Sequence, residues 1–224
     1  MRISSAATFL PKLARGAIGR ILCKARYGDA VVLMVDGGLA SQVWKAVFGE
    51  WLAERTGCRV LYDTSWFRED GKDIRGRDSR TLAVRETFPA VSMVEADDRM
   101  ARDLRRYRRL SNPRPHAAPI EPGKRPPSYY DGYYMNAYYF ESRKDEVRRL
   151  LRFSERIAES ERCRRYAGSI AGSGRPVAVH VRRWDYVGSI HDVLSPRYYL
   201  DAVEEIARRR RGLGGIELYF FTND

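Results

Sequence analysis

The sequence predicts an α/β protein composed of two Rossmann-like domains, the second of them incomplete. Two stretches carry this prediction, residues 30–67 and residues 177–222, because each alternates an apolar strand, a loop, an amphipathic helix and another apolar strand. Composition agrees, since 44% of the residues are hydrophobic and 224 residues are enough for one large or two small domains. Parallel strands are expected, because a crossover helix normally joins strands that run in the same direction.

The first stretch begins with the apolar segment AVVLMVD at residues 30–36, which predicts a buried strand. Two consecutive glycines end that strand. A helix is expected over residues 39–57, because aliphatic and aromatic side chains recur there at four-residue spacing and a glycine suits the helix end. The segment CRVLYDTSWF at residues 58–67 then predicts a second strand and its exit.

The middle of the chain is more charged and less regular. Arginine-rich helices are expected over residues 101–109 and 141–165. The segment AGSIAGSGRP at residues 167–176 is rich in small residues and ends in proline, which is typical of a linker. We therefore expect an N-terminal α/β domain over residues 30–170 and a second domain over residues 171–224.

The second stretch starts with VAVHVR at residues 177–182, a predicted strand. A helix is expected from Pro196, with Ser195 as its N-cap, because proline is favoured in the first helical turn. The segment IELYFFTND follows as another strand and ends at Asp224. Since a doubly wound domain needs several further strands, we expect this second domain to be truncated in the chain.

Residues 1–29 form a basic segment in which arginines and lysines are interspersed with aliphatic residues. This pattern is typical of an amphipathic helix that rests on an anionic membrane, so peripheral contact with the inner face of the cytoplasmic membrane is one expectation. A frayed tail or an over-long assigned start explains the pattern equally well. No signal-peptide core is visible, and the apolar run at residues 30–35 is too short to span a bilayer.

The net charge of +12 favours anionic partners, such as nucleotide phosphates, nucleic acid or an anionic membrane. The three cysteines, Cys23, Cys58 and Cys163, form no CxxC pair, and the three histidines show no HExxH spacing. We therefore expect a cytoplasmic protein without a bound metal.

Charged side chains gather where the strand at residues 177–182 ends. Because side chains alternate along a strand, His180 and Arg182 share the face opposite the three valines. Arg183 and Asp185 follow directly. Ligands of open α/β sheets bind at the carboxyl ends of strands, where guanidinium groups can offer paired donors to phosphate oxygens. Taken alone, a salt bridge at the surface is the alternative explanation for these residues.

Four segments together extend this interpretation. HVRRWDYV resembles the HVRRGDYV signature of the α-1,2-fucosyltransferases, glycosyltransferase family 11. DGGLASQVWKAVFGEWLAERTGCRVLYDTSWF is similar to the glycine-rich loop, helix and strand that open that family. DGYYMNAYYFESRKDEVRRLLRF is similar to its GYWQSEKYF segment. HDVLSPRYYLDAVEEI, followed by ELYFFTND, is similar to its HP-x-YY-x-x-AI helix and F-S-D-D strand, so the four segments keep the family's order.

The resemblance implies a GT-B-like fold of two Rossmann-like domains. It also implies transfer of fucose from GDP-fucose with inversion, without a metal or other cofactor, to a galactoside-type acceptor on a cell-surface glycan such as an O-antigen. Arg182 would hold the diphosphate, because a guanidinium stabilises the negative charge that grows on the leaving group. The other residues implied on the GDP-fucose side are His180, Arg183, Asp185, Tyr186, Thr222 and Asp224. The resemblance identifies no catalytic base.

The turn that contains Gly37, Gly38, Ser41 and Gln42 would face the same cleft, because glycines permit close backbone approach and a helix N-terminus offers N–H groups to an anion. An ordinary strand-to-helix turn explains the two glycines equally well. The six tyrosines between residues 129 and 139 are expected to pack in the core more than to stack on sugars.

Several positions depart from the family pattern. Trp184 stands where the family has glycine, and Ala40, Ser41 and Lys45 replace its Gly, Asn and Gln.

Two alternatives to an active enzyme are also open. The first is a non-catalytic truncated remnant of such an enzyme. The second is a basic nucleic-acid-binding protein, which the net charge and the arginines of residues 101–115 suggest.

Overall fold

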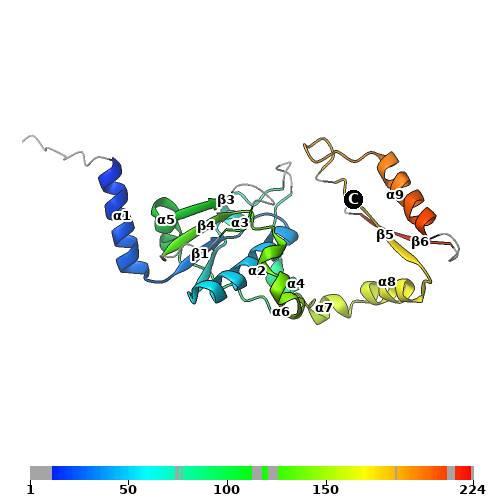
Figure 1. The fold of residues 1–224 in the computed structure, drawn as a ribbon, viewed down its shortest axis with the longest axis horizontal. Coiled ribbons are helices and arrows are strands. Elements are labelled where there is room, and N and C mark those ends of the chain that lie inside the picture. Colours follow the sequence, from blue (N-terminus) through cyan, green and yellow to red (C-terminus); the bar gives the residue numbers. More distant parts are fainter. Residues whose placement is uncertain are drawn as a thin grey trace, which may run out of the picture. The chain divides into compact units, whose positions relative to one another are not determined.

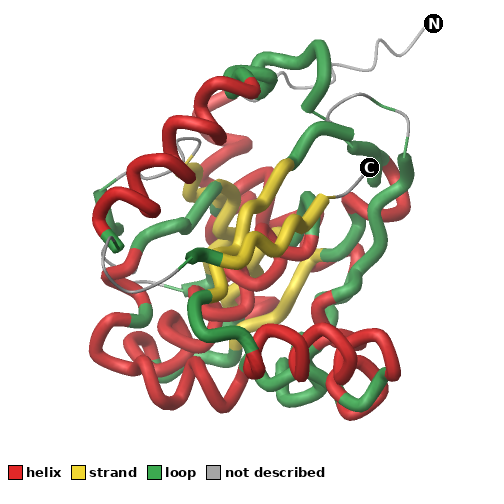
Figure 2. Tube along the Cα trace, turned by 90° about the vertical axis from the view of Figure 1, so that its right-hand side faces the viewer, coloured by secondary structure: helices red, strands yellow, loops and turns green. Residues whose placement is uncertain are grey.

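The structure is a computed structural model that describes residues 12–73, 76, 78–112, 118–120, 126–184, 186–210 and 215–222. The chain divides into two compact units, whose elements are labelled in Figure 1. The first unit comprises Met1–Gly71 and Arg80–Arg152, and the second comprises Lys72–Ser79 and Phe153–Asp224. Each unit contains a parallel sheet together with helices (Figure 2), so the predicted α/β class with parallel strands is confirmed.

The sheet of the first unit has four parallel strands in the order β2-β1-β4-β3. Its strands are β1 (Val31–Met34), β2 (Val60–Asp63), β3 (Arg109–Asn112) and β4 (Ser128–Gly132). Val32 of β1 lies opposite Leu61 of β2 and Tyr129 of β4. The strands predicted at residues 30–36 and 58–67 are confirmed as β1 and β2, whereas the sequence pattern does not indicate β3 and β4.

Helix α2 (Leu39–Thr56) covers one face of this sheet and confirms the helix predicted over residues 39–57. Its Phe48 is fully buried and packs in one apolar cluster with residues of β1, β2 and β4. Gly49 brings the helix close to β2, because a Cβ at that position would lie 2.1 Å from the Tyr62 hydroxyl. The glycine in the middle of α2 is therefore required by packing.

Helices α1 (Lys12–Tyr27) and α5 (Asp98–Tyr107) cover the opposite face of the sheet. Cys23 of α1 and Leu104 of α5 are buried there against Val32 and Leu61. A helix within the basic N-terminal segment is thus confirmed by α1, while residues 1–11 lie outside the described part of the chain. Across the described ranges, no helix is long and apolar enough to cross a lipid bilayer.

The tyrosine-rich segment supplies much of the core, as predicted. Four of its tyrosines are no more than 1% exposed: Tyr129, Tyr130, Tyr134 and Tyr139. Phe48 stacks on Tyr134 with the ring centroids 3.9 Å apart. Tyr133 and Tyr138 remain 40% exposed, so they contribute less to this core.

Short helical elements complete the connections: α3 (Trp66–Glu69), α4 (Val84–Thr87), η1 (Ala137–Tyr139), η2 (Glu141–Arg143), α6 (Lys144–Leu150) and α7 (Glu155–Ala158). The single helix predicted over residues 141–165 is wrong, because α8 (Glu161–Gly172) starts afresh after Ser160. The Ser160 hydroxyl accepts the N–H of Cys163, and such an N-cap stabilises a new helix start. Helix α8 also runs into the small-residue segment that the sequence predicts as a linker.

The second unit contains a two-stranded parallel sheet of β5 (Pro176–Val181) and β6 (Glu217–Thr222), and α9 (Pro196–Arg209) joins them along the chain. These elements confirm the predicted strand, helix and strand. Val177 and Val179 form the buried side of β5, as their alternation indicates. The Tyr219 hydroxyl of β6 donates to the Ser169 carbonyl of α8 at 3.0 Å. Because α8 packs with this sheet, the second unit begins at Phe153, before the boundary expected at residue 171.

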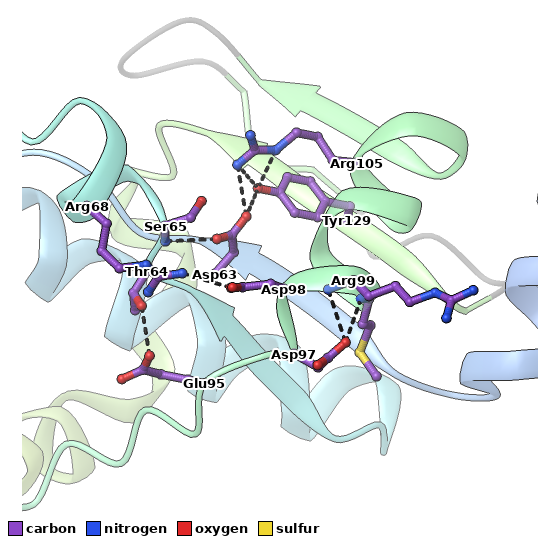
Figure 3. A network of polar contacts seen from close by, with 11 residues as sticks. Asp63, Thr64, Ser65, Arg68, Glu95, Asp97, Asp98, Arg99, Arg105 and Tyr129 are labelled. Atoms are coloured by element: carbon purple, nitrogen blue, oxygen red, sulfur yellow. Dashed lines mark hydrogen bonds and ion pairs between the residues drawn. The ribbon is translucent and has the colours of Figure 1, made fainter.

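A buried carboxylate ties three elements of the first unit together (Figure 3). Asp63, at the end of β2, accepts hydrogen bonds from the Tyr129 hydroxyl at 2.6 Å, from Arg105 Nη2 at 2.9 Å and from the Ser65 N–H at 2.9 Å. Burial alone would raise the pKa of Asp63, but these hydrogen bonds and the charge of Arg105 outweigh it and hold the pKa below its usual range. The network thereby joins β2, β4 and α5 through one negative charge.

The lowered pKa of Asp63 makes the stability of the first unit depend on pH. The folded-state pKa lies below the unfolded-state value, so the contribution of this carboxylate is fully present above about pH 3.9 and is lost as the pH falls through the folded-state pKa. We expect the free energy of unfolding to fall more steeply below about pH 4 in the wild type than in Asp63→Asn. Urea unfolding followed by tryptophan fluorescence at a series of pH values measures how the free energy of unfolding of each protein changes with pH.

At neutral pH, Asp63→Asn should lower the free energy of unfolding by about 2 to 3 kcal/mol, because it weakens hydrogen bonds to a buried charged group. Asp98→Asn is the matched control, since Asp98 forms only an exposed ion pair with Arg68 at 2.8 Å and should keep the acid slope of the wild type. Equal acid slopes for Asp63→Asn and the wild type would contradict the role assigned to Asp63.

Candidate functional site

The carboxyl end of β5 opens onto a cavity of about 500 Å³ within the second unit. The end of the strand, the loop that follows and the start of α9 all contribute to its lining, which includes His180, Arg182, Arg183, Tyr186, His191 and Tyr199. Four residues that the sequence predicts at the GDP-fucose side therefore meet in one hollow. They meet because β5 buries its valines and turns out its polar side chains only where the strand ends.

Aromatic stacking organises the basic groups of this cavity. The Arg182 guanidinium carbon lies 4.3 Å from the Tyr186 ring centroid, and the Tyr186 ring stacks on His191 with centroids 5.0 Å apart. Arg183 Nη1 lies 3.9 Å from Asp192 Oδ1, and the other oxygen of Asp192 accepts the Gly188 N–H at 3.0 Å. A guanidinium that is stacked by its face keeps its N–H donors at its edge, the geometry that suits a phosphate group.

The other predicted residues of this strand end are placed less completely. Thr222 is the register partner of Val181, so it lies at the same end of the two-stranded sheet. Asp185 and Asp224 lie outside the described residues. Trp184, at the position where the family has glycine, donates its indole N–H to Asp78 at 2.7 Å, which ties the loop to another segment of the second unit.

Six residues of the cavity are not predicted from the sequence, and three of them are polar or aromatic: His191, Asp192 and Tyr199. All three lie in the segment HDVLSPRYY, which in the sequence indicates a helix start and carries part of the family resemblance. A signal for His191 and Asp192 is the run of polar residues directly before α9, and a signal for Tyr199 is its place in the first turn of that helix, because ligands of open α/β sheets bind where such loops follow the strand ends.

The turn between β1 and α2 lies in the first unit, and glycine is required at only one of its positions. Gly37 has a φ of 76°, in the left-handed region that favours glycine, and a Cβ there would lie 2.9 Å from Ser41 Oγ. Gly38 precedes α2 with a φ of −77°, which any residue can adopt. The conformation of the turn therefore accounts for the glycine at position 37.

Gln42, a predicted residue of the cleft loop, is 1% exposed and directs its amide into the protein. Its Nε2 donates to the Gly37 carbonyl at 3.1 Å and to the Thr81 carbonyl at 2.8 Å. Its Oε1 accepts the buried Val84 N–H at 3.0 Å. These three hydrogen bonds fix the turn after β1 to the start of α4, which gives Gln42 a positioning role in the fold.

Lys45 is a buried charge that the sequence analysis does not single out as a site residue. Its side chain is 1% exposed, its Nζ lies 3.4 Å from Asp36 Oδ1, and it donates to the Gly132 carbonyl. Burial lowers the pKa of Lys45, and the Asp36 carboxylate opposes that shift. Because Asp36 follows β1 and Gly132 ends β4, Lys45 links the carboxyl ends of two neighbouring strands. The apolar stripe of α2 does not indicate that its single lysine is buried.

No protein-family model matches the sequence, and no curated protein matches it. One solved structure is similar. It is the crystal structure of fucosyltransferase NodZ from Bradyrhizobium, with a TM-score of 0.47 and 15% sequence identity over 88% of this chain and 72% of that chain. A similarity at this level does not assign an activity to the present chain.

The described ranges also bear on cysteine and metal chemistry. No group of three or more His, Cys, Asp or Glu residues is placed there to hold a metal ion. Cys23, Cys58 and Cys163 carry free thiols.

The hydrogen bonds of Gln42 predict a loss of stability when its amide is removed. In Gln42→Met, the buried Val84 N–H and the Thr81 carbonyl lose their partner, so we expect the free energy of unfolding to fall by about 2 to 4 kcal/mol. Urea unfolding of the purified protein measures this change. Ser41→Ala, in the same turn, should change stability by about 0.5 kcal/mol or less and is the matched control. If Gln42→Met unfolded like the wild type and only lost affinity for a ligand, the positioning role would be wrong.

Proposed function

We propose that this chain is an inverting glycosyltransferase of GT-B architecture, which moves fucose from GDP-fucose to a galactoside-type acceptor on a cell-surface glycan. The proposal rests on the cavity at the end of β5, where His180, Arg182, Arg183 and Tyr186 of the segment HVRRWDYV line one hollow. Two guanidinium groups at the carboxyl end of a parallel strand suit the diphosphate of a nucleotide sugar.

In the proposed reaction, an oxygen of the acceptor attacks the anomeric carbon of fucose from the face opposite the diphosphate. The bond between that carbon and the phosphate oxygen breaks, and its electron pair leaves with GDP. The acceptor hydroxyl gives its proton to a base that we leave unassigned. Arg182 donates hydrogen bonds to the departing diphosphate, so it stabilises the transition state more than the ground state. Tyr186 holds the guanidinium by its face, and the arginines supply positive charge without requiring a metal ion.

We place the reaction in the cytoplasm as part of the same proposal. The three free thiols suit a reducing compartment, and the implied partners are a nucleotide sugar and a glycan acceptor.

Calorimetry with GDP and GDP-fucose tests the nucleotide site directly. We expect the chain to bind both, and Arg182→Ala to weaken GDP binding by about tenfold to a hundredfold, because each hydrogen bond to a charged group contributes about 1.5 to 3 kcal/mol. Arg182→Lys should recover part of the affinity, since it keeps the charge but loses the paired donors. Fucose transfer should disappear in Arg182→Ala.

Arg197→Ala provides the matched control, because Arg197 lies on α9 in an exposed ion pair with Asp201 and does not line the cavity. It should bind GDP like the wild type. GDP affinity that is unchanged in Arg182→Ala would overturn the assignment. GDP binding without any transfer would favour the alternative of a non-catalytic relative of such enzymes.

A further inference from the structure

Helix α1 attaches to the first unit through a face of small residues. Gly19 and Cys23 face α5, and a Cβ on Gly19 would lie 2.4 Å from the Tyr107 ring. At the end of the helix, the Tyr27 hydroxyl donates to Asp103 of α5 at 2.6 Å. Burial and this hydrogen bond raise the pKa of Tyr27 to about 12, so the phenol remains a donor at neutral pH. The inner face of α1 is therefore fixed without its large aliphatic side chains.

Three large aliphatic side chains of α1 lie on its outer face instead. Ile18 is 45% exposed, Ile21 is 67% exposed and Leu22 is 62% exposed. In a surface helix of a globular protein, the apolar stripe normally faces the core. In α1 this arrangement is reversed, because small residues contact the protein and branched aliphatic residues are exposed to solvent. Such an arrangement indicates that the outer face contacts another apolar phase.

Basic side chains flank this outer apolar stripe on both sides. With about 3.6 residues per turn, Arg20 and Lys24 fall on one flank, and Arg15 and Arg26 fall on the other. The helix sequence KLARGAIGRILCKARY contains no acidic residue. An apolar strip between two rows of cations is the pattern of helices that lie in the interface of an anionic bilayer.

One flank also forms a hollow of about 570 Å³ with a basic rim. Ala17, Ile21 and Ala25 contribute apolar lining, and Arg20, Lys24 and Arg108 contribute the cationic groups. Arg108 follows α5, and its Nε donates to the Pro127 carbonyl at 2.7 Å, which holds the side chain beside α1. A hollow that combines alkyl groups with cations suits the junction between a lipid phosphate and its acyl chains.

We propose that the outer face of α1 is a docking surface for a bilayer that contains anionic phospholipids, with Ile18, Ile21 and Leu22 inserted at the acyl boundary and the flanking cations on the phosphates. Nucleic acid would also attract the cations, but it offers no apolar phase for three exposed aliphatic side chains. This inference does not rest on the proposed sugar transfer, because it uses only α1, α5 and the residues that pack between them.

Flotation with lipid vesicles tests the proposal with the full chain. We expect the protein to float with vesicles of phosphatidylglycerol and phosphatidylcholine in equal parts, and to float weakly with phosphatidylcholine alone or at high salt. Lys24→Gln should reduce the partition coefficient about fivefold, because one cation near an anionic surface contributes about 1 kcal/mol. The double variant Ile21→Gln, Leu22→Gln should reduce it by at least about tenfold, since two side chains lose their apolar environment.

Matched controls separate the α1 face from the general charge of the protein. Arg85→Gln and Val94→Gln remove an exposed cation and an exposed aliphatic side chain outside α1, and both should bind vesicles like the wild type. Ile21→Leu, which keeps the apolar character, should also bind normally. The substituted side chains of α1 are exposed, so circular dichroism should show unchanged folding in every variant.

Three outcomes would overturn the proposal. The first is equal flotation of the double variant and the wild type. The second is vesicle binding that is lost equally in Arg85→Gln and Lys24→Gln. The third is an absence of vesicle binding. RNA binding that depends on Lys24 would then assign the face to nucleic acid, and self-association that depends on Ile21 and Leu22 would assign it to a second copy of the chain.

Discussion

The arrangement of the first unit depends on the buried carboxylate of Asp63. This charge is stabilised because Tyr129 of β4, Arg105 of α5 and the Ser65 N–H all donate to it (Figure 3). Helix α5 is thereby fixed over one face of the sheet, and it offers Asp103 to the hydroxyl of Tyr27 on α1. The orientation of α1, and hence which of its faces meets the solvent, follows from an ion pair that lies on other elements of the unit.

The two parallel sheets use their carboxyl ends in different ways. At the end of β1, the polar groups are largely satisfied within the protein, since Gln42 bonds to three backbone groups and Lys45 joins Asp36 to the end of β4. At the end of β5, arginine, histidine and tyrosine side chains line an open hollow and stack on one another. The first end is built as a rigid turn, and the second presents basic and aromatic side chains to a hollow.

The strands and helices with a clear hydrophobic period could be predicted from the sequence, and the elements defined by tertiary contacts could not. The apolar runs and the four-residue stripe locate β1, α2, β2, β5, α9 and β6, and the strand end at His180 locates four of the ten residues that line the cavity. Strand β4 has tyrosines buried on both faces, so it shows no alternation of polar and apolar residues. Strand β3 is polar and owes its conformation to pairing with β4. Gln42 and Lys45 escape prediction because burial of a polar side chain depends on partners that are distant in sequence.

The position of β4 in the sheet has a consequence for biosynthesis. It is the last of the four strands to be made, yet it lies between β1 and β3 and forms the pairing that unites them. Until residues 128–132 leave the ribosome, β1 and β2 can form only a two-stranded ribbon, and β3 lacks the strand with which it pairs. Closure of the sheet is thus a late, long-range event, and the edge of β1 that pairs with β4 stays open until β4 has been made. During that interval the unpaired edge of β1 is open to pairing with a strand of another chain.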